Sequence, residues 1–261
     1  MKVLFVGDTH GNGHWWDAVV SPVAARVGAD AVVQVGDFGF WPGEEGRWFL
    51  DAVADTGVPV YFCDGNHEHH DHLAEVVTDA RRRTGIGDLR EPVPVGEQLW
   101  YLPRGGRIQF GPVQLCSLGG AHSIDRAYRT PGSSWFDAEH VTDDDLAEAC
   151  AGGRCDVLVT HDAPSGWAVP GLPAASEMSA AMQLELPAAH AHRMRLREAY
   201  EALQPSVVVH GHYHSRYRTT VTEPWGEVTV EGLDCDGTTG AFSSMECSTT
   251  PELHTVTITL Q

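Results

Sequence analysis

The stretch Val3-Leu4-Phe5-Val6-Gly7-Asp8-Thr9-His10 decides the fold of this chain. Its four apolar residues, rich in β-branched and aromatic types, predict a short buried strand. Gly7 ends the strand, and a carboxylate and an imidazole follow it two residues apart. These groups are poor core material but good metal ligands. We therefore expect metal-binding side chains at the carboxyl end of the first strand.

Four later segments repeat this plan of a buried strand followed by Asp, Asn or His. The predicted strands cover residues 30–35, 58–63, 156–160 and 206–209. They lead to Asp37, to Asn66 and His67, to His161, and to His212 and His214. Because all five strands end in polar groups of the same kind, we expect these ends to meet at one metal centre.

The first third of the chain predicts a parallel sheet. Asp8 and Asp37 are 29 residues apart, and so are Asp37 and Asn66. This is about the length of one βαβ unit, and helical patterns at 14–27 and 45–55 lie between the strands. We therefore expect two right-handed crossovers here.

The rest of the sequence predicts a mixture of hairpins and helices. Strands at 99–102, 107–110 and 113–118, with Gly-Gly and Gly-Pro between them, indicate hairpins. Thr142 precedes an acidic first helical turn, the Pro-rich segment 164–187 predicts a loop, and 188–203 predicts a helix. A hairpin at 216–222 and 227–231 and a last strand at 256–260 complete the pattern. The expected fold class is α/β, with two mixed β-sheets packed face to face and helices outside, in a single domain over residues 1–261.

Composition restricts the partners of this chain. Its 261 residues carry a net charge of −19, which argues against long duplex nucleic acid and anionic membranes. No apolar run is long enough to cross a bilayer, and the run after Lys2 is too short for a signal peptide. We therefore expect a cytoplasmic location. Six cysteines without CxxC spacing are expected to be structural.

The expected centre contains two carboxylates, one amide oxygen and four imidazoles, and it contains no thiolate. This set suits Mn, Fe or Zn, with Ni or Co as further candidates, and two ions can share it if one carboxylate bridges them. Bound divalent cations would also reverse the local potential, so that a small phosphorylated substrate can approach an acidic protein. The seven candidate ligands are Asp8, His10, Asp37, Asn66, His161, His212 and His214.

These segments, in this order, resemble the calcineurin-like metallophosphoesterase superfamily, whose signature is DxH, GDxxD, GNHD or GNHE, a lone His, and GHxH. The resemblance runs from Asp8 to His214. It implies a four-layer sandwich of helices and two mixed sheets, and a dinuclear metal-dependent phosphoesterase. It implies that Asp37 bridges two ions: one is held also by Asp8, His10 and His214, and the other by Asn66, His161 and His212.

The resemblance also implies that a hydroxide activated by the metals attacks phosphorus, and that His67 assists as a non-ligand catalytic group. One departure concerns the second Asp of GDxxD, which orients this histidine in relatives and is replaced here by Phe40. We expect Glu68, Glu44 or Glu45, or a backbone carbonyl, to orient His67 instead.

The loop 119–129 is the best candidate for substrate contacts, because it holds arginines that can reach a phosphate. Our candidates here are His122, Arg126 and Arg129.

The expected substrate is a small or medium phosphate ester or a short nucleotide. Retention of His67, which can assist a poor leaving group, slightly favours a phosphodiester over a phosphomonoester. A non-catalytic metal-bound scaffold of the same fold is the alternative from another class, although all seven ligand positions hold competent residues. A hydrolase acting on a substrate other than a phosphate would need only the activated water.

Overall fold

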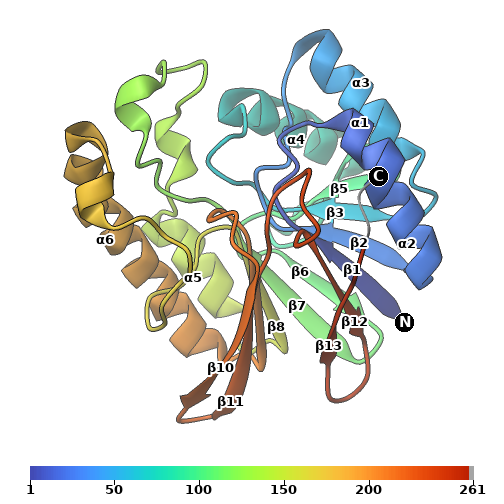
Figure 1. Cartoon of the computed structure of the whole chain (residues 1–261). Coiled ribbons are helices and arrows are strands. Elements are labelled where there is room, and N and C mark those ends of the chain that lie inside the picture. The colour runs from blue at the N-terminus through green and yellow to red at the C-terminus, as the bar shows by residue number, and fades with distance from the viewer. Residues whose placement is uncertain (259–261) are drawn as a thin grey trace.

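A computed structural model describes residues 1–258 of the chain. Within them, two β-sheets pack face to face, with helices on both outer sides (Figure 1). The first sheet has the strand order β13 (Glu252–Thr255), β12 (Phe242–Glu246), β1 (Lys2–Val6), β2 (Ala31–Gln34), β3 (Val60–Phe62), β5 (Leu99–Tyr101) and β4 (Val93–Gly96). The second has the order β10 (Tyr217–Glu223), β11 (Gly226–Gly232), β9 (Val207–His210), β8 (Val157–Thr160), β7 (Val113–Leu118) and β6 (Arg107–Phe110).

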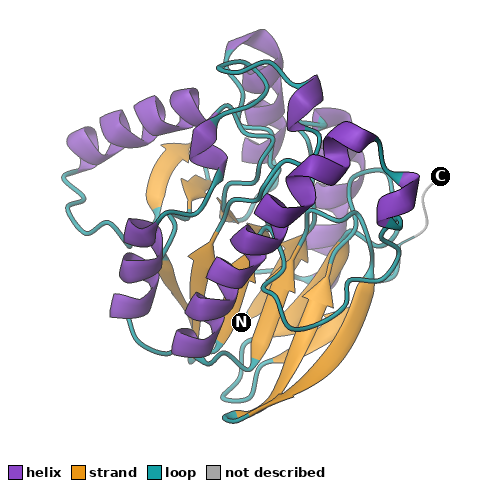
Figure 2. Ribbon diagram, turned by 90° about the vertical axis from the view of Figure 1, so that its left-hand side faces the viewer, coloured by secondary structure: helices purple, strands orange, loops and turns teal. Residues whose placement is uncertain are grey.

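The helices divide between the two outer layers. Those beside the first sheet are α1 (Gly13–Trp15), which passes through a π-helical turn into α2 (Ser21–Val27), then α3 (Gly43–Ala54) and α4 (His70–Thr84). Those beside the second are α5 (Asp143–Ala151) and α6 (Ala180–Leu203). Figure 2 shows the long helix crossing in front of the strands. The four-layer sandwich of two mixed sheets is therefore confirmed.

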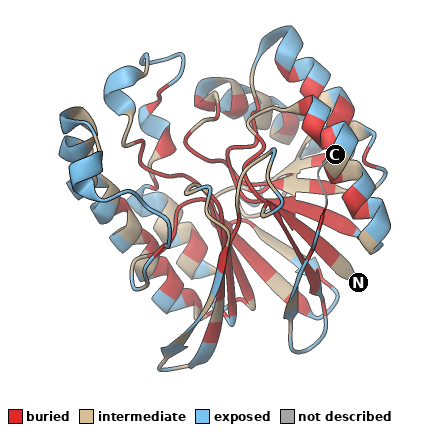
Figure 3. Ribbon diagram, in the orientation of Figure 1, coloured by how far each residue is buried: buried red, intermediate tan, exposed pale blue. Residues whose placement is uncertain are grey.

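Strand alternation explains the layers. Successive side chains of a strand point to opposite faces, so Leu4 and Val6 pack against the first helical layer, whereas Val3 and Phe5 pack between the sheets. The strands of the second sheet follow the same rule. Figure 3 shows that the central strands are buried and that exposed residues lie on the outer faces of the helices, in loops and on the β10–β11 and β12–β13 hairpins. The polar ends of these strands are thus the chemically distinctive part of a largely apolar interior.

The parallel pairing positions these ends. β2 pairs in parallel with both β1 and β3, as the two predicted crossovers require. In the second sheet, β8 pairs in parallel with β9. Because parallel strands end at the same edge of a sheet, the polar residues that follow them gather at one rim.

The start of helix α6 differs from the sequence prediction. Helix α6 begins eight residues before the predicted start at 188 and contains Pro187 in its interior. Ser179 caps it by accepting a hydrogen bond from the Met182 amide at 3.2 Å, and good helix formers follow. The end of the predicted loop 164–187 is therefore helical.

The last predicted strand, 256–260, is also wrong in its described part. β13 ends at Thr255, and residues 256–258 are not strand, while 259–261 lie outside the described residues. β12 was missed because its alternation is weak, with two serines beside Phe242. It pairs antiparallel with β1 along all five residues.

No helix in the described part of the chain is both long and apolar enough to span a membrane. All six cysteines are free thiols, and four of them are buried.

Candidate metal centre

The structure brings the polar strand ends together at the rim shared by both sheets. Asp8, Asp37 and Asn66 follow β1, β2 and β3 of the first sheet, and His161 and His212 follow β8 and β9 of the second. All five are buried or nearly so. Two sets of residues there have potential ligand atoms that, within each set, all lie within 4.8 Å of one another. The sets are Asp8, His10 and His214, and Asp8, Asp37 and His161.

The first half of the cluster surrounds Asp8. Its Oδ2 lies 3.1 Å from Nε2 of His214, and its carboxylate accepts a hydrogen bond from the backbone amide of His212 at 3.1 Å. Nε2 of His10 lies 3.6 Å from Oδ2 of Asp37. The His10 and His214 rings meet edge to face with centroids 5.1 Å apart. Two imidazoles and two carboxylates thus face one small volume.

The second half surrounds His161. Its Nδ1 lies 3.0 Å from the carbonyl oxygen of Val35, which can only accept, so in the neutral ring this nitrogen carries the proton. Its Nε2 then presents a lone pair toward Asp37 Oδ1 and Asn66 Oδ1, each 3.2 Å away. Three electron-rich atoms that converge in this way fit a cation, and an N–H directed to a carbonyl is the usual support of a metal-binding histidine.

Asp37 is shared between the halves. Its Oδ2 faces His10 and its Oδ1 faces His161, while Oδ1 also accepts the backbone N–H of His67 at 2.8 Å. Burial alone would raise the pKa of Asp37, but the facing imidazoles hold it well below its usual range. The carboxylate is therefore ionised and placed where one group can serve two ions.

The carboxylates create a strongly negative potential. Burial alone would lower the pKa of His10, but hydrogen bonds to Asp236 and Asp37 raise it to about 11. The pKa of His161 rises to about 9 because Asp37 and Asp8 outweigh its burial. The pKa of His212, by contrast, falls to about 4, mainly through burial. The potential that stabilises imidazolium ions here would also stabilise bound cations.

Backbone strain is concentrated in the cluster. Within residues 1–258, six non-glycine residues have positive φ, and four belong to the seven predicted ligands: His10, Asp37, His212 and His214. The left-handed region costs such residues about 1 kcal/mol or more, so the surrounding fold must enforce it. Conformations of this kind are typical of functional sites, where a side chain has to leave a strand in an unusual direction.

Two glycines allow the strand ends to approach so closely. A Cβ at Gly65 would lie 2.1 Å from Oδ1 of Asp37 and 2.8 Å from Nε2 of His161. A Cβ at Gly211 would lie 2.0 Å from Oδ1 of Asp8. These distances are impossible for real atoms, so the glycines beside the ligands are a steric requirement of the cluster.

Several supporting residues were missed by the sequence analysis. Asp236 lies 3.2 Å from Nδ1 of His10 and accepts a hydrogen bond from Asn12 at 2.7 Å. Asp162 accepts from Tyr213 at 2.5 Å and pairs with His192 at 2.9 Å. The polar run that follows β11 is the signal that could have pointed to Asp236, because it repeats the plan of a strand with a carboxylate at its end.

Glu68, which we expected to orient His67, binds other groups, and a different residue contacts the His67 ring. Both oxygens of Glu68 accept backbone N–H groups, from Phe38 at 2.6 Å and from Gly39 and Phe40 at 3.0 and 2.8 Å. Glu68 thus fixes the loop after β2, and the expectation that it orients His67 is wrong. Glu44 and Glu45 are exposed on α3. The partner found for the His67 ring is Arg129, whose Nη2 lies 2.5 Å from its Nε2.

The structure separates the three candidates of the loop 119–129. Arg129 lies at the cluster, where its Nη1 also donates to the carbonyl of Asn66 at 3.1 Å. Arg126 instead lies over the Trp135 ring, 4.0 Å from its centroid. His122 and Arg126 line a different pocket, so their substrate contact stays a prediction that this geometry does not favour.

A cleft of about 600 Å³ opens beside the cluster. Its polar end contains Asp37, Asn66, His67, Arg129 and His212. Its other wall is largely apolar and comes from the segment before α6 and the first turns of that helix. The apolar lining residues are Ile124, Leu172, Pro173, Met178, Met182, Leu186 and Ala189. Such a cleft can hold a polar group at the cluster and an apolar group farther out.

Comparison with known proteins agrees with this arrangement. A family model described as calcineurin-like phosphoesterase matches residues 1–216. No curated protein sequence matches the chain significantly.

Among solved structures, one Thermus thermophilus protein covers 97% of this chain and 98% of its own, with 12% identity and a TM-score of 0.57. This likeness shows the fold alone. A hypothetical protein from the same organism covers 97% of this chain and 99% of its own, at 14% identity and a TM-score of 0.49. A novel phosphatase from Mycoplasma pneumoniae covers 90% and 72%, at 14% identity and a TM-score of 0.43.

Proposed function

Because the chain belongs to the calcineurin-like phosphoesterase family and is a phosphoester hydrolase, we propose that it hydrolyses a small or medium phosphodiester at a dinuclear metal centre. The observation that carries this proposal is the sharing of Asp37, whose two oxygens face His10 and His161 on opposite sides. A shared carboxylate flanked by two sets of lone-pair donors is the arrangement that two divalent ions require.

The ligand sets that we propose follow the two halves of the cluster. Asp8, His10 and His214 hold one ion, and Asn66, His161 and His212 hold the other, with Asp37 common to both. The donor chemistry fits this assignment, since in the neutral ring of His161 the unprotonated nitrogen is Nε2, which lies 3.2 Å from oxygens of both Asp37 and Asn66. When bound, two such ions neutralise phosphate charge and lower the pKa of a water molecule. Oxygen and imidazole donors suit Mn, Fe or Zn.

The chain's own residues would then bind and assist the ester. Arg129 is placed to donate hydrogen bonds to a phosphate, because its guanidinium lies at the polar end of the cleft. His67 lies beside it and is the proposed group that stabilises the leaving oxygen or protonates it. Its pKa is lowered by burial and by Arg129, against the influence of Asp37.

The cleft supports an ester with an apolar or aromatic group. Met178, Met182 and Leu186 form an apolar wall of the cleft that also contains residues of the cluster. Thioether side chains adapt to flat or irregular apolar groups. A phosphodiester can present one ester group to His67 and lay the other along this wall. A phosphomonoester of a large alcohol would use the same surfaces, and a non-catalytic scaffold would need only the metal cluster.

The deciding experiment is hydrolysis by metal-stripped enzyme after adding back Mn²⁺, Fe²⁺, Ni²⁺ or Zn²⁺. Bis-p-nitrophenyl phosphate and p-nitrophenyl phosphate serve as substrates, and Asp37→Asn is the control. We expect metal-dependent cleavage of the diester that the variant lacks. Preference for the monoester would overturn the diesterase assignment, and failure to bind two ions at the cluster would overturn the dinuclear centre. Two bound ions without cleavage of either ester would favour the scaffold.

A further inference from the structure

A second cluster of potential metal ligands lies outside the main centre. The ligand atoms of His122, Glu139 and His140 all lie within 4.8 Å of one another. His122 belongs to the loop after β7, and the other two belong to a short turn before α5. The cluster borders a pocket of about 390 Å³ against α6, to which Glu185 and His192 contribute. None of these residues has a part in the proposed phosphoester site.

The hydrogen bonds of this cluster fix where the ring protons are. Nδ1 of His140 lies 3.0 Å from the carbonyl oxygen of Asp137, which can only accept, so this nitrogen carries a proton. Nε2 of His122 lies 3.0 Å from a carboxylate oxygen of Glu185, so this nitrogen also carries one. In the neutral rings, the remaining nitrogens are therefore both unprotonated.

These two unprotonated nitrogens face each other. Nδ1 of His122 lies only 2.7 Å from Nε2 of His140. Two lone pairs at this distance repel unless a positive species interacts with both. That species is either an additional proton or a metal ion.

A metal ion suits this group of atoms better than an additional proton does. An additional proton would be held by the two nitrogens alone, although a carboxylate oxygen of Glu139 also lies within 4.8 Å of the cluster's ligand nitrogens. Transition metals, by contrast, bind neutral imidazoles through the lone pair itself.

We propose that His122 Nδ1, His140 Nε2 and the carboxylate of Glu139 form a second metal site, for a single divalent transition ion of the zinc type. Zn–N bonds of about 2.0–2.1 Å with tetrahedral angles require the two nitrogens to be roughly 3.3 Å apart. The half-exposed His140 ring can move outward by this small amount. His122, His140 and Glu185 line the pocket beside the cluster, so that water in the pocket could supply a fourth ligand.

The surroundings of Glu139 suit its carboxylate to bind a cation. Its side chain is fully buried, and Oε1 lies 3.6 Å from Nε2 of His140. Its carboxylate accepts from the Ser123 amide at 2.9 Å, the Ser123 hydroxyl at 2.6 Å and the Trp135 indole at 3.1 Å. A carboxylate offers about four lone-pair sites, so one is left for a cation.

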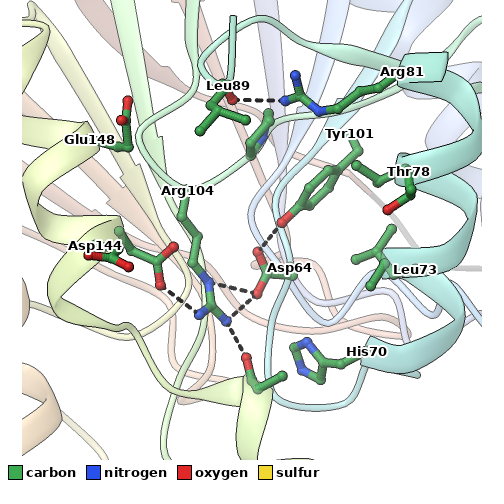
Figure 4. A pocket seen from close by; sticks show the side chains of 15 residues that line it. Asp64, His70, Leu73, Thr78, Arg81, Leu89, Tyr101, Arg104, Asp144 and Glu148 are labelled. Atoms are coloured by element: carbon green, nitrogen blue, oxygen red, sulfur yellow. Dashed lines mark hydrogen bonds and ion pairs between the residues drawn. The ribbon is translucent and has the colours of Figure 1, made fainter. Parts of the chain in front are cut away.

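Arg104 holds the same turn rigidly in place. It donates to the carbonyl oxygens of Ala138, Glu139 and His140 at 2.8, 3.2 and 2.5 Å. It also pairs with Asp64 at 2.6 Å, and Figure 4 shows its guanidinium between this carboxylate and the turn. Because Asp64 follows β3, the turn is fixed to the strand end that carries Asn66. Ligands supported in this way are pre-organised for a metal.

The two centres are connected by a short chain of hydrogen bonds. The side-chain amide of Asn66 donates to the Ser123 hydroxyl at 3.0 Å, and that hydroxyl donates to Glu139 at 2.6 Å. A cation on Glu139 would fix this carboxylate and, through Ser123, the direction of the Asn66 amide. The second ion would therefore position a residue of the main centre without contacting substrate.

Zinc content tests this proposal independently of activity. The chain is equilibrated with Zn²⁺, freed of unbound metal by gel filtration and measured by inductively coupled plasma mass spectrometry. We expect His140→Ala to bind one zinc ion fewer than the unmodified chain. His254→Ala, which removes an exposed imidazole on β13, should bind the full number. An equal zinc content in His140→Ala and the unmodified chain would overturn the site.

A second variant measures zinc at the proposed site after the carboxylates of the main cluster have been removed. Asp8→Asn/Asp37→Asn removes both carboxylates of the main cluster, and we expect it to retain one zinc ion, which a further His140→Ala substitution removes. Loss of all zinc from the double variant, with its circular dichroism and melting unchanged, would show that the second site does not exist. Because the comparison concerns a single ion, it does not depend on whether the chain hydrolyses phosphodiesters.

Discussion

The guanidinium of Arg129 lies 2.5 Å from Nε2 of His67. Because a guanidinium can only donate, this nitrogen accepts, and the neutral ring carries its proton on Nδ1. The position that should orient His67 by family resemblance holds Phe40, which is buried against Phe62 in the core. An arginine from a loop 62 residues away in sequence therefore contacts the histidine in its place.

His67→Ala should lower kcat by roughly 100-fold or more, which is the usual contribution of a general acid or base. The loss should be greater for an alkyl ester than for a p-nitrophenyl ester, since p-nitrophenolate leaves readily without a proton. Steady-state kinetics with both esters measure the difference. His14→Ala, which removes an exposed imidazole, is the control. An unchanged kcat for the alkyl ester would remove His67 from the reaction.

Arg129→Ala should raise KM by roughly 10- to 100-fold, because charged hydrogen bonds to phosphate contribute about 1.5–3 kcal/mol. Arg126→Ala serves as a matched variant from the same loop, whose side chain packs on Trp135 away from the cleft. We expect its KM to remain within about twofold of the original. Equal effects of the two substitutions would contradict the separation of these arginines by the fold.

Gly65→Ala should disrupt the centre more than the fold. The new Cβ would overlap Asp37 Oδ1, so the carboxylate or the strand end must move. Misplacement by about 1 Å can reduce a rate about 100-fold, and we expect kcat/KM and metal content to fall together. Gly87→Ala, where a Cβ would meet no neighbour within 4 Å, is the control. A fully active Gly65→Ala protein would disprove the steric argument.

His70 should make stability depend on pH. The residue is 7% exposed, its Nε2 has no partner in the described structure, and burial lowers its pKa to about 4. In the unfolded chain, the His70 imidazole binds a proton near pH 6.5. The difference in pKa therefore costs the folded state no stability above that pH. Stability should fall as pH drops from about 6.5 to about 4, by at most about 1.4 kcal/mol per pH unit.

Urea unfolding in the presence of a chelator measures this effect between pH 7.5 and pH 4.5. His70→Leu should lose less stability over this range than the unmodified chain, and His254→Leu should behave like the unmodified chain. If all three lose the same stability, His70 is not the group responsible.

The strand ends could be predicted because their signal is local. Val3 to His10 contains the apolar run, the glycine that ends it and the polar groups that follow, all within eight residues. The parallel pairing of β1, β2 and β3 then follows from the spacing of such units. Boundaries were less certain, as α6 shows: its cap at Ser179 competes with the helix-breaking tendency of Pro187.

The sequence by itself thus determined the sandwich of two sheets and the residues gathered at its rim, because hydrophobic alternation and ligand type are properties of short segments. Only the tertiary structure decided the partners of these residues. Asp236 reaches His10 across 226 positions, and Glu185 reaches His122 across 63. Such contacts depend on how whole layers pack, since a side chain's hydrogen-bond partner is selected by distance in space. No pattern within either segment encodes that distance.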